Sequence, residues 1–231
     1  MKEYISGGLS GIAQILVGYP LDTMKVLKQN NIKINMKNSL NYNGVKYPLQ
    51  LSIISNSIVF GISNTLNKYN IYQYSTNKKI NNNINMFING YVAGIVSSPF
   101  VYIYDIKKTN VQTNNNNKLK DFMIKSKFNG LFMTIMRESI GFGTYFCVYD
   151  LLKNEYKYNT EISGGLAGVT NWTITYAIDV IKNRQLSNNI SIIEAYKMKN
   201  MFSGYKYCLL RAFIVNSLIF SVYEKINNII N

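Results

Sequence analysis

The stretch GYPLDTMK, residues 18–25, closes a long uncharged run that begins at Tyr4. Asp22 and Lys25 end this run, three positions apart. The same Asp and Lys spacing returns twice further along the chain, in IYDIKK (residues 103–108) and AIDVIK (residues 177–182). Glycines lie 11 and 15 positions before each of the three aspartates: Gly11 and Gly7, Gly94 and Gly90, Gly168 and Gly164. Markers at fixed offsets in three copies predict an internal threefold repeat.

A second set of markers is independent of the first. The triplets YNG, FNG and FSG end at Gly44, Gly130 and Gly204. Nineteen positions after these glycines come Ser63, Tyr149 and Tyr223, each followed by a polar residue: Asn64, Asp150 and Glu224. Each repeat therefore reads as an odd-numbered helix with a Gly-x-x-x-Gly face, a polar loop and an even-numbered helix. Small residues at that spacing let helix backbones approach closely in lipid.

Six windows are apolar enough to span a membrane, for which about 20 residues are needed. They are Tyr4–Leu21, Tyr47–Asn67, Ile80–Tyr104, Gly130–Tyr149, Ile162–Ile178 and Tyr205–Tyr223. A soluble bundle with buried helices is the alternative, but it does not account for the repeats. We predict an all-α membrane protein with six transmembrane helices, whose repeats occupy residues 1–73, 80–157 and 158–231.

The composition narrows the function. A formal net charge of +14 suits nucleic acid, an anionic membrane surface or an anionic small molecule. No nucleic-acid-binding module is present, so we predict no nucleic-acid partner. The chain has no histidine, which excludes a His-based triad and a His-ligated zinc. Cys147 and Cys208 lie in apolar runs and read as buried free thiols. Without a nucleophile–base pair, metal cluster or phosphate loop, we predict neither an enzyme nor a cofactor or metal.

These motifs resemble the mitochondrial carrier family, whose repeat signature is Pro-x-Asp/Glu-x-x-Lys/Arg at the end of each odd helix. PLDTMK matches fully, whereas Ile103 and Ala177 replace proline in the other copies. The resemblance covers essentially the whole chain, and the short length with A/T-rich coding also resembles carriers of giant DNA viruses. It implies a pseudo-threefold barrel that exchanges solutes by alternating access in the mitochondrial inner membrane. It further implies a functional monomer, both termini on the cytosolic (intermembrane-space) side, and membrane lipid such as cardiolipin as a partner.

By this resemblance the repeated charges form a matrix gate, in which Lys25 pairs with Asp105, Lys108 with Asp179, and Lys182 with Asp22. Six charges gathered in a low-dielectric bundle are costly unless they pair, which gives the ring a physical reason. Gln29 and Gln112 occupy the position of a bracing glutamine, whereas Leu186 does not. Ordinary ion pairs within each helix end are the alternative reading.

The resemblance also implies a cytosolic gate at the opposite end, made by Asp150, Lys153 and Glu224. Its best bridge joins Lys153 to Glu224, and Lys68 is a candidate partner of Asp150. We predict that the matrix gate is the stronger, so that the resting protein favours the cytosol-open state.

Arg137 and Arg211 each follow the repeat glycine by seven positions, which places them midway through the fourth and sixth helices. Charges inside a span are functional candidates. The remaining predicted substrate-binding residues lie at the same depth: Leu51, Ser52, Glu138 and Trp172. Arginine suits carboxylate or phosphate because its fork binds either in a bidentate manner. The alternative is that Arg137 and Glu138 serve only to satisfy each other.

Two classes of small-molecule substrate compete. In having an Arg-Glu pair on the fourth helix, the chain resembles carriers of amino acids and carnitine esters. The sequences NW in the fifth helix and LRAF in the sixth helix point to the same class of carriers. The basic excess instead suits nucleotides, whose bases could stack on Tyr145 and Trp172. From the sequence we favour nucleotides or deoxynucleotides, with amino-acid or carnitine-type substrates as the alternative. A third possibility is that the protein is a membrane adaptor that does not transport, because two of the three motif prolines are missing.

Overall fold

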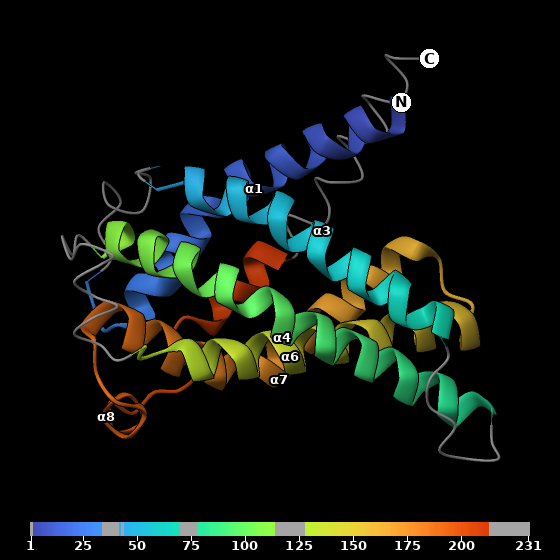
Figure 1. The fold of residues 1–231 in the computed structure, drawn as a ribbon. Coiled ribbons are helices and arrows are strands. Elements are labelled where there is room, and N and C mark those ends of the chain that lie inside the picture. The colour runs from blue at the N-terminus through green and yellow to red at the C-terminus, as the bar shows by residue number, and fades with distance from the viewer. Residues whose placement is uncertain (1, 34–41, 43, 70–77, 114–127, 213–231) are drawn as a thin grey trace.

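The computed structural model describes residues 2–33, 42, 44–69, 78–113 and 128–212. Regular structure in this part of the chain is entirely helical (Figure 1). The elements are α1 (Lys2–Gln29), α3 (Lys46–Tyr69), α4 (Lys78–Gln112), α6 (Leu131–Asp150), the π-helix η1 (Leu151–Glu155), α7 (Thr160–Asn188) and α8 (Ile192–Lys197). Residues 205–212 are also helical. Five of the six predicted windows thus fall within, or within one residue of, one long helix each.

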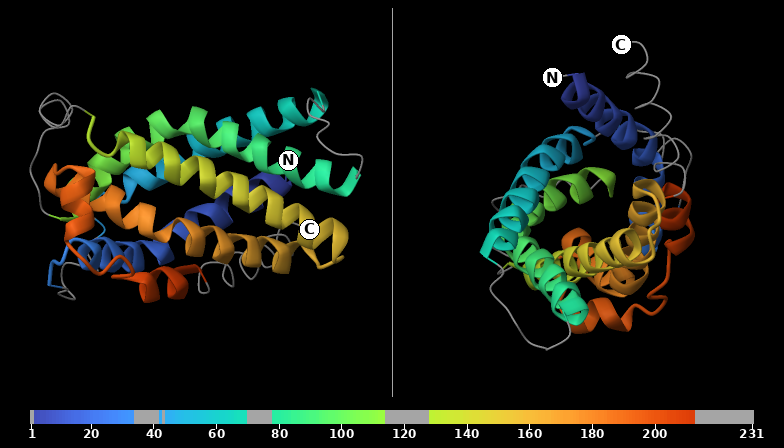
Figure 2. Two further views of the ribbon diagram at one scale, coloured as in Figure 1. Left: turned by 90° about the horizontal axis from the view of Figure 1, so that it is seen from below. Right: turned by 90° about the vertical axis from the view of Figure 1, so that its right-hand side faces the viewer.

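The long helices lie side by side and form a ring when seen end-on (Figure 2). Helix α4 packs against α3 and α6, and α6 packs against α7, while α1 contacts α3, α4 and α7. By length and composition alone, one helical segment of the described chain, Asn82–Gln112, is apolar enough to cross a membrane. The sixth window is described only to residue 212, so the six-span pseudo-threefold barrel stays a prediction.

The three glycines of the second repeat register adopt the same unusual backbone conformation. Their φ angles are 91° at Gly44, 88° at Gly130 and 85° at Gly204. L-residues are strained in this left-handed region, whereas glycine adopts it freely. Gly44 lies two residues before α3, Gly130 directly before α6, and Gly204 directly before the helical segment 205–212. The chain therefore turns in the same way at the same point of each repeat.

The proline of the first motif is accommodated by its own repeat. Pro20 lies inside α1 and has no N–H to donate to the carbonyl four residues earlier, at Leu16. The Tyr42 hydroxyl donates to that Leu16 carbonyl at 3.0 Å, and the Tyr42 ring stacks on Tyr19 with centroids 5.8 Å apart. The equivalent residues in the other repeats, Phe128 and Phe202, have no hydroxyl. Among these three equivalent residues, the hydroxyl therefore occurs only in the repeat whose Asp-x-x-Lys motif carries the proline.

The Gly-x-x-x-Gly face packs closely in the second repeat. A Cβ at Gly94 would lie 2.5 Å from the Glu138 carbonyl oxygen, and one at Gly90 would overlap the Phe142 carbonyl. Helices α4 and α6 therefore approach backbone to backbone, which confirms the prediction for this copy. The prediction is wrong for Gly168 within the described chain, because nothing lies within 4 Å of a Cβ there. The surroundings of Gly7 and Gly11 lie outside the described residues.

This difference gives a matched pair of variants. Gly94→Ala should lower the thermal unfolding midpoint by several degrees, because a methyl group against backbone must push the helices apart at a cost of about 1–3 kcal/mol. Gly168→Ala, at the same repeat position, should leave the midpoint unchanged or raise it slightly, since alanine favours helix. Thermal unfolding of the purified variants in detergent checks both. Equal midpoints for the two would contradict the packing described here.

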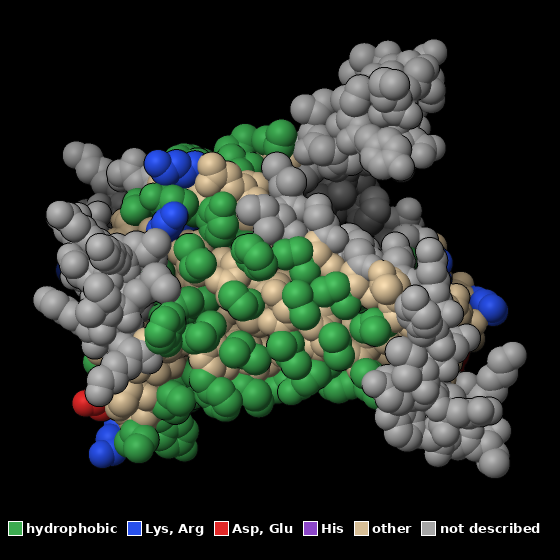
Figure 3. Space-filling model, viewed as in Figure 1, with side chains coloured by type: hydrophobic (Ala, Val, Ile, Leu, Met, Phe, Trp, Pro, Cys, Tyr) green, Lys and Arg blue, Asp and Glu red, His purple; other side chains and the backbone are tan. Residues whose placement is uncertain are grey.

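Apolar side chains lie on the outside of the bundle and charged side chains lie inside it, which is the reverse of the distribution in a soluble bundle. Apolar side chains cover the middle of the face in Figure 3. Ile95, Val96 and Phe100 of α4 are among the large apolar residues that are exposed. Inside, Lys182 and Asp179 are almost fully buried. Extended apolar exteriors mark contact with lipid or partners, and buried ionisable groups must pair.

Candidate functional site

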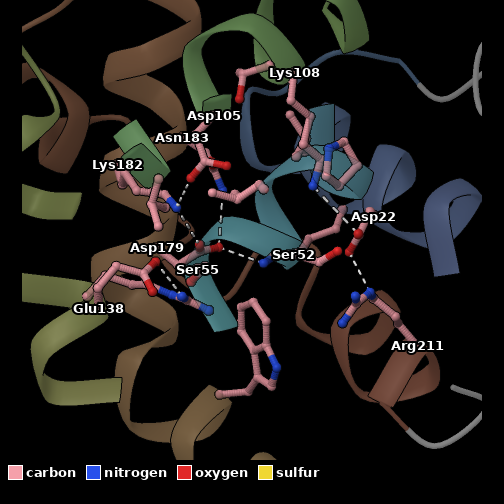
Figure 4. A pocket seen from close by; sticks show the side chains of 18 of the residues that line it. Asp22, Ser52, Ser55, Asp105, Lys108, Glu138, Asp179, Lys182, Asn183 and Arg211 are labelled. Carbon is pink, nitrogen blue, oxygen red and sulfur yellow. Dashed lines mark hydrogen bonds and ion pairs between the residues drawn. The ribbon is translucent and has the colours of Figure 1, made fainter. Parts of the chain in front are cut away.

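A cavity of about 370 Å³ lies between the described long helices (Figure 4). Asp22, Asp105 and Asp179, from the C-terminal parts of α1, α4 and α7, are part of its lining. Helices α1, α3, α4, α6 and α7 and the helical segment 205–212 all contribute to its lining. Five bases and four acids line it: Lys25, Lys108, Lys182, Arg137 and Arg211, with Asp22, Asp105, Asp179 and Glu138. The charges of opposite sign are therefore nearly balanced.

All six predicted substrate-site residues line this cavity: Leu51, Ser52, Arg137, Glu138, Trp172 and Arg211. The six predicted matrix-gate residues line the same cavity: Asp22, Lys25, Asp105, Lys108, Asp179 and Lys182. We call these six the charged ring. The two layers predicted as separate are thus continuous, and side chains of one contact side chains of the other. Which of them bind substrate remains a prediction.

The charged ring is closed, but its pairs run in the opposite sense to the one the resemblance implied. Lys25 Nζ lies 2.7 Å from Asp179 Oδ2, Lys182 Nζ lies 2.8 Å from Asp105 Oδ2, and Lys108 Nζ lies 3.5 Å from Asp22 Oδ2. The predicted pairings of Lys25 with Asp105, Lys108 with Asp179 and Lys182 with Asp22 are therefore wrong. Residue spacing along one helix does not encode this sense, because each lysine has an aspartate on either neighbouring odd helix.

The strength of the three contacts is unequal. The side chains of Lys25 and Asp179 are 6% and 3% exposed, whereas those of Lys108 and Asp22 are 19% and 15% exposed. Lys182 also lies 3.5 Å from Asp179 on its own helix. The alternative prediction, an ion pair within one helix end, therefore holds in the third repeat, alongside the bridge from Lys182 to Asp105. Buried pairs at short distance are less screened by water, so the Lys25–Asp179 bridge is the tightest in the ring.

Amide side chains surround that bridge. Gln29 donates from Nε2 to Asp179 Oδ2 at 3.1 Å, which is the contact expected of a brace. Asn183 donates to Gln29 Oε1 at 2.6 Å and to Asp179 Oδ2 at 3.1 Å. Gln112 instead donates to the Thr23 hydroxyl at 2.9 Å, beside the ring rather than on a carboxylate. Sequence reasoning missed Asn183, because the residue after the motif lysine is not repeated in the other copies.

Arg211 lies nearer the charged ring than its position in the helix suggested. Its Nε is 2.8 Å from Asp22 Oδ1, so the sixth helix is tied to α1 through a ring carboxylate. We expected Arg211 midway through the sixth helix, where it adds to the excess of basic groups in the central site. Because Asp22 takes this charge, the basic excess that favoured a polyanionic substrate is smaller than the sequence indicated.

Arg137 forms an ion pair with its neighbour Glu138, whose side chain is 4% exposed. The guanidinium carbon of Arg137 lies 4.6 Å from the centre of the Trp172 ring, and Lys25 Nζ lies 4.1 Å from the same centre. Both distances suit cation–π attraction. Arg137 Nε is buried and has no hydrogen-bond partner within the described part of the chain.

Tyr145 does not line the cavity. Its ring stacks on Tyr149, with centroids 6.2 Å apart and planes inclined by 10°. The predicted pair of aromatic side chains for a nucleobase is therefore not assembled, because of these two residues Trp172 alone lines the cavity.

At the opposite end, Asp150 accepts hydrogen bonds from Asn82 at 2.6 Å and Asn154 at 2.5 Å. Lys153 donates to the Tyr149 hydroxyl at 3.1 Å. Glu224 lies outside the described residues, as does the side chain of Lys68, so neither predicted bridge at this end is tested. Both cysteines carry free thiols, Cys208 buried and Cys147 half-buried.

Comparison with known proteins adds independent evidence. The chain is 26% identical to the mitochondrial arginine transporter BAC2 of Arabidopsis thaliana, over 96% of this chain and 89% of that one. It is 28% identical to mitochondrial substrate carrier family protein S of Dictyostelium discoideum, over 97% and 95%. It is 24% identical to the mitochondrial basic amino acids transporter of Rattus norvegicus, over 95% and 86%. No family model matches the chain.

A helical bundle with an apolar exterior and a charged central cavity has the architecture of a membrane solute carrier. The relatives match this chain along nearly its whole length and are named as carriers or transporters, which agrees with the prediction that it is not an enzyme. Along nearly its whole length the chain is similar to mitochondrial carriers, among them a protein named for the mitochondrial substrate carrier family.

Proposed function

We propose that this protein is a multi-pass carrier of the mitochondrial inner membrane that exchanges amino acids, with basic amino acids such as arginine as the first candidates. The observation that carries the proposal is the mixed charge of the central cavity, where Arg137 and Glu138 lie side by side against Trp172. Relatives named as transporters of arginine and of basic amino acids support it. A relative from Saccharomyces cerevisiae named as a glycine transporter, 26% identical over 97% of this chain, keeps smaller amino acids within the class.

The charge balance favours a zwitterion over a nucleotide. An amino acid brings a carboxylate and an ammonium group, which need a base and an acid at short range. Arg137 offers a fork for the carboxylate, and Glu138 with the Trp172 face offers an anionic and aromatic surface for the ammonium. A nucleotide needs several uncommitted cations for its phosphates, but Lys25, Lys182 and Arg211 are each paired with an aspartate.

The closed charged ring supports exchange by alternating access. A ring of ion pairs at one end blocks the cavity there, and substrate contacts that favour a rearranged state shift the equilibrium toward opening. In this proposal the ring is the matrix gate and the cavity is reached from the cytosolic side. Both termini then lie on that side, and the carrier functions as a monomer.

A non-transporting adaptor is the second candidate. It is favoured by Asp150, whose carboxylate is occupied by Asn82 and Asn154 in the described chain instead of a lysine. A protein of that kind would keep its fold but would neither bind nor exchange amino acids.

Ligand binding to the purified carrier separates these functions. Millimolar arginine or lysine should raise the thermal unfolding midpoint by several degrees, because a ligand at 100 times its Kd stabilises the folded state by about 2.7 kcal/mol. ADP at the same concentration should leave the midpoint unchanged. Arg137→Lys should reduce the arginine shift, since an ammonium cannot replace the fork. A shift with ADP and none with any amino acid would contradict the proposal.

A further inference from the structure

Arg184 is fully buried, with 0% of its surface exposed, and no ion pair joins it to a carboxylate in the described chain. It lies two positions after Lys182, near the end of α7. The equivalent residues of the other repeats are Leu27 and Asn110, so nothing in the repeat pattern singles it out. Burying an arginine without a counter-charge is costly unless its donors are satisfied, so this side chain calls for an explanation.

Backbone carbonyls satisfy the guanidinium. Arg184 Nε donates to the Gln29 carbonyl at 2.8 Å, and its Nη1 donates to the Ala195 carbonyl at 3.0 Å. Its Nη2 donates to the Lys199 carbonyl at 2.7 Å and to that of Asn200 at 3.3 Å. Gln29 ends α1, and Ala195 belongs to the last turn of α8. The last carbonyls of a helix lack partners within it and carry its negative dipole end, so two helix ends stand in for the missing counter-charge.

Three more hydrogen bonds join the same two parts of the chain. Ser203 donates to the Lys28 carbonyl at 2.8 Å, Asn188 donates to Asn30 Oδ1 at 3.2 Å, and Asn183 donates to Gln29 Oε1 at 2.6 Å. Every donor belongs to the third repeat, and every acceptor lies at the end of α1 or directly after it. We call Arg184, Asn188, Ser203 and their acceptors the latch.

The latch holds Gln29 by its backbone while the Gln29 side chain contacts Asp179 of the tightest ring bridge. We propose that Arg184 is a positioning residue of the gate: it fixes the end of α1 so that Gln29 braces the Lys25–Asp179 bridge, and so holds the charged ring closed. The ring is then asymmetric. It is strongest between the first and third repeats and weakest at Lys108 and Asp22, where the ion pair is longer and more exposed. This inference rests on the proposed role of the ring as a gate.

The test measures opening at the ring end without using substrate, so its result does not depend on the substrate proposed above. A reporter cysteine replaces Ser55, a buried residue that lines the cavity, in a background with Cys147→Ala and Cys208→Ala. Its reaction rate with a membrane-impermeant thiol reagent is measured from the ring side of oriented proteoliposomes. Arg184→Gln should raise this rate several-fold, and Gln29→Leu should raise it to a similar extent.

The double variant decides between positioning and mere structural support. If Arg184 acts through Gln29, then Arg184→Gln combined with Gln29→Leu should react no faster than either single variant. Rates that multiply would overturn the proposal, as would an unchanged rate in Arg184→Gln. Arg184→Lys, which retains charge and one donor group, should give an intermediate rate.

A milder variant keeps the proposal testable if Arg184→Gln does not fold. Ser203→Ala removes one latch bond and should raise the labelling rate about twofold to threefold, the change expected for a lost hydrogen bond near the lower end of the usual range. The matched control is Thr113→Val, because within the described chain the Thr113 hydroxyl bonds to the Thr109 carbonyl of its own helix end, at 2.9 Å. Equal rates in these two variants would overturn the role of the latch.

Discussion

Reversing the charge at Lys25 should abolish transport, and reversing Asp179 in the same protein should restore part of it. The two side chains meet at 2.7 Å and are almost excluded from water. Lys25→Asp alone places two carboxylates together at a buried site, and breaking such a pair costs about 3–5 kcal/mol. Adding Asp179→Lys re-forms an ion pair of opposite polarity. Exchange rate and thermal unfolding midpoint, measured on reconstituted and purified protein, report the loss and the recovery.

The control for this exchange is the pairing that the family resemblance implied. Lys25→Asp combined with Asp105→Lys should recover neither transport nor stability, because Asp105 lies against Lys182. Recovery in this double variant, together with none in the Lys25→Asp and Asp179→Lys variant, would reverse the sense of the ring described here. Partial recovery is the expectation even for the correct pair, since Lys182 lies 3.5 Å from Asp179 and would meet the new lysine.

Removing Arg137 should reduce exchange at least a hundredfold while leaving a separable effect on stability. Arg137→Ala deletes the proposed carboxylate site and also leaves Glu138 buried without its ion-pair partner, and such an unpaired charge is destabilising. Combining it with Glu138→Gln removes the unpaired charge, so the thermal unfolding midpoint should recover. Exchange should not recover, because the fork that binds substrate is still missing.

That double variant distinguishes the proposed role of Arg137 from the reading in which Arg137 and Glu138 only satisfy each other. Under the latter reading, neutralising both would restore stability and transport together. Recovery of exchange to near the wild-type rate would therefore remove Arg137 from the substrate site and leave the function of the cavity to Arg211 and the charged ring.

Helix periodicity and the repeat offsets predicted which residues line the cavity. Leu51, Arg137 and Trp172 were placed at one depth by counting from repeat glycines and aspartates, and the structure puts all three on the cavity wall. This works because each repeat has the same turn at its glycine, with φ near 90° at Gly44 and Gly130. Equal counts along equivalent helices then correspond to equal depths.

Pairing across helices could not be predicted in the same way. Position along a helix places Lys25 at the level of both Asp105 and Asp179 but does not say which neighbour it meets. Arg211 was placed by its count from Gly204, yet its long side chain reaches Asp22 at the level of the ring. The nucleotide preference rested on treating that arginine as unpaired and on Tyr145 facing the cavity, and the structure contradicts both premises.

Contacts made by one copy alone were also beyond sequence reasoning. Arg184 is satisfied by carbonyls from α1 and α8, and backbone acceptors have no signature in the sequence. Tyr42 bonds the carbonyl released by Pro20, and only in hindsight does the difference between Tyr42 and Phe128 indicate this. The proline of GYPLDTMK is thus a local feature of the first repeat, whereas Asp22 and Lys25 join the cross-helix ring.

Counter-exchange of arginine tests the central claim most directly. Proteoliposomes containing the wild-type protein and loaded with unlabelled arginine should take up labelled arginine in a saturable manner. Empty vesicles, or vesicles loaded with ADP, should take up far less, and Arg137→Ala combined with Glu138→Gln should show only background uptake. Exchange of labelled nucleotides with no exchange of arginine, lysine or glycine would contradict the account of the cavity as an amino-acid site.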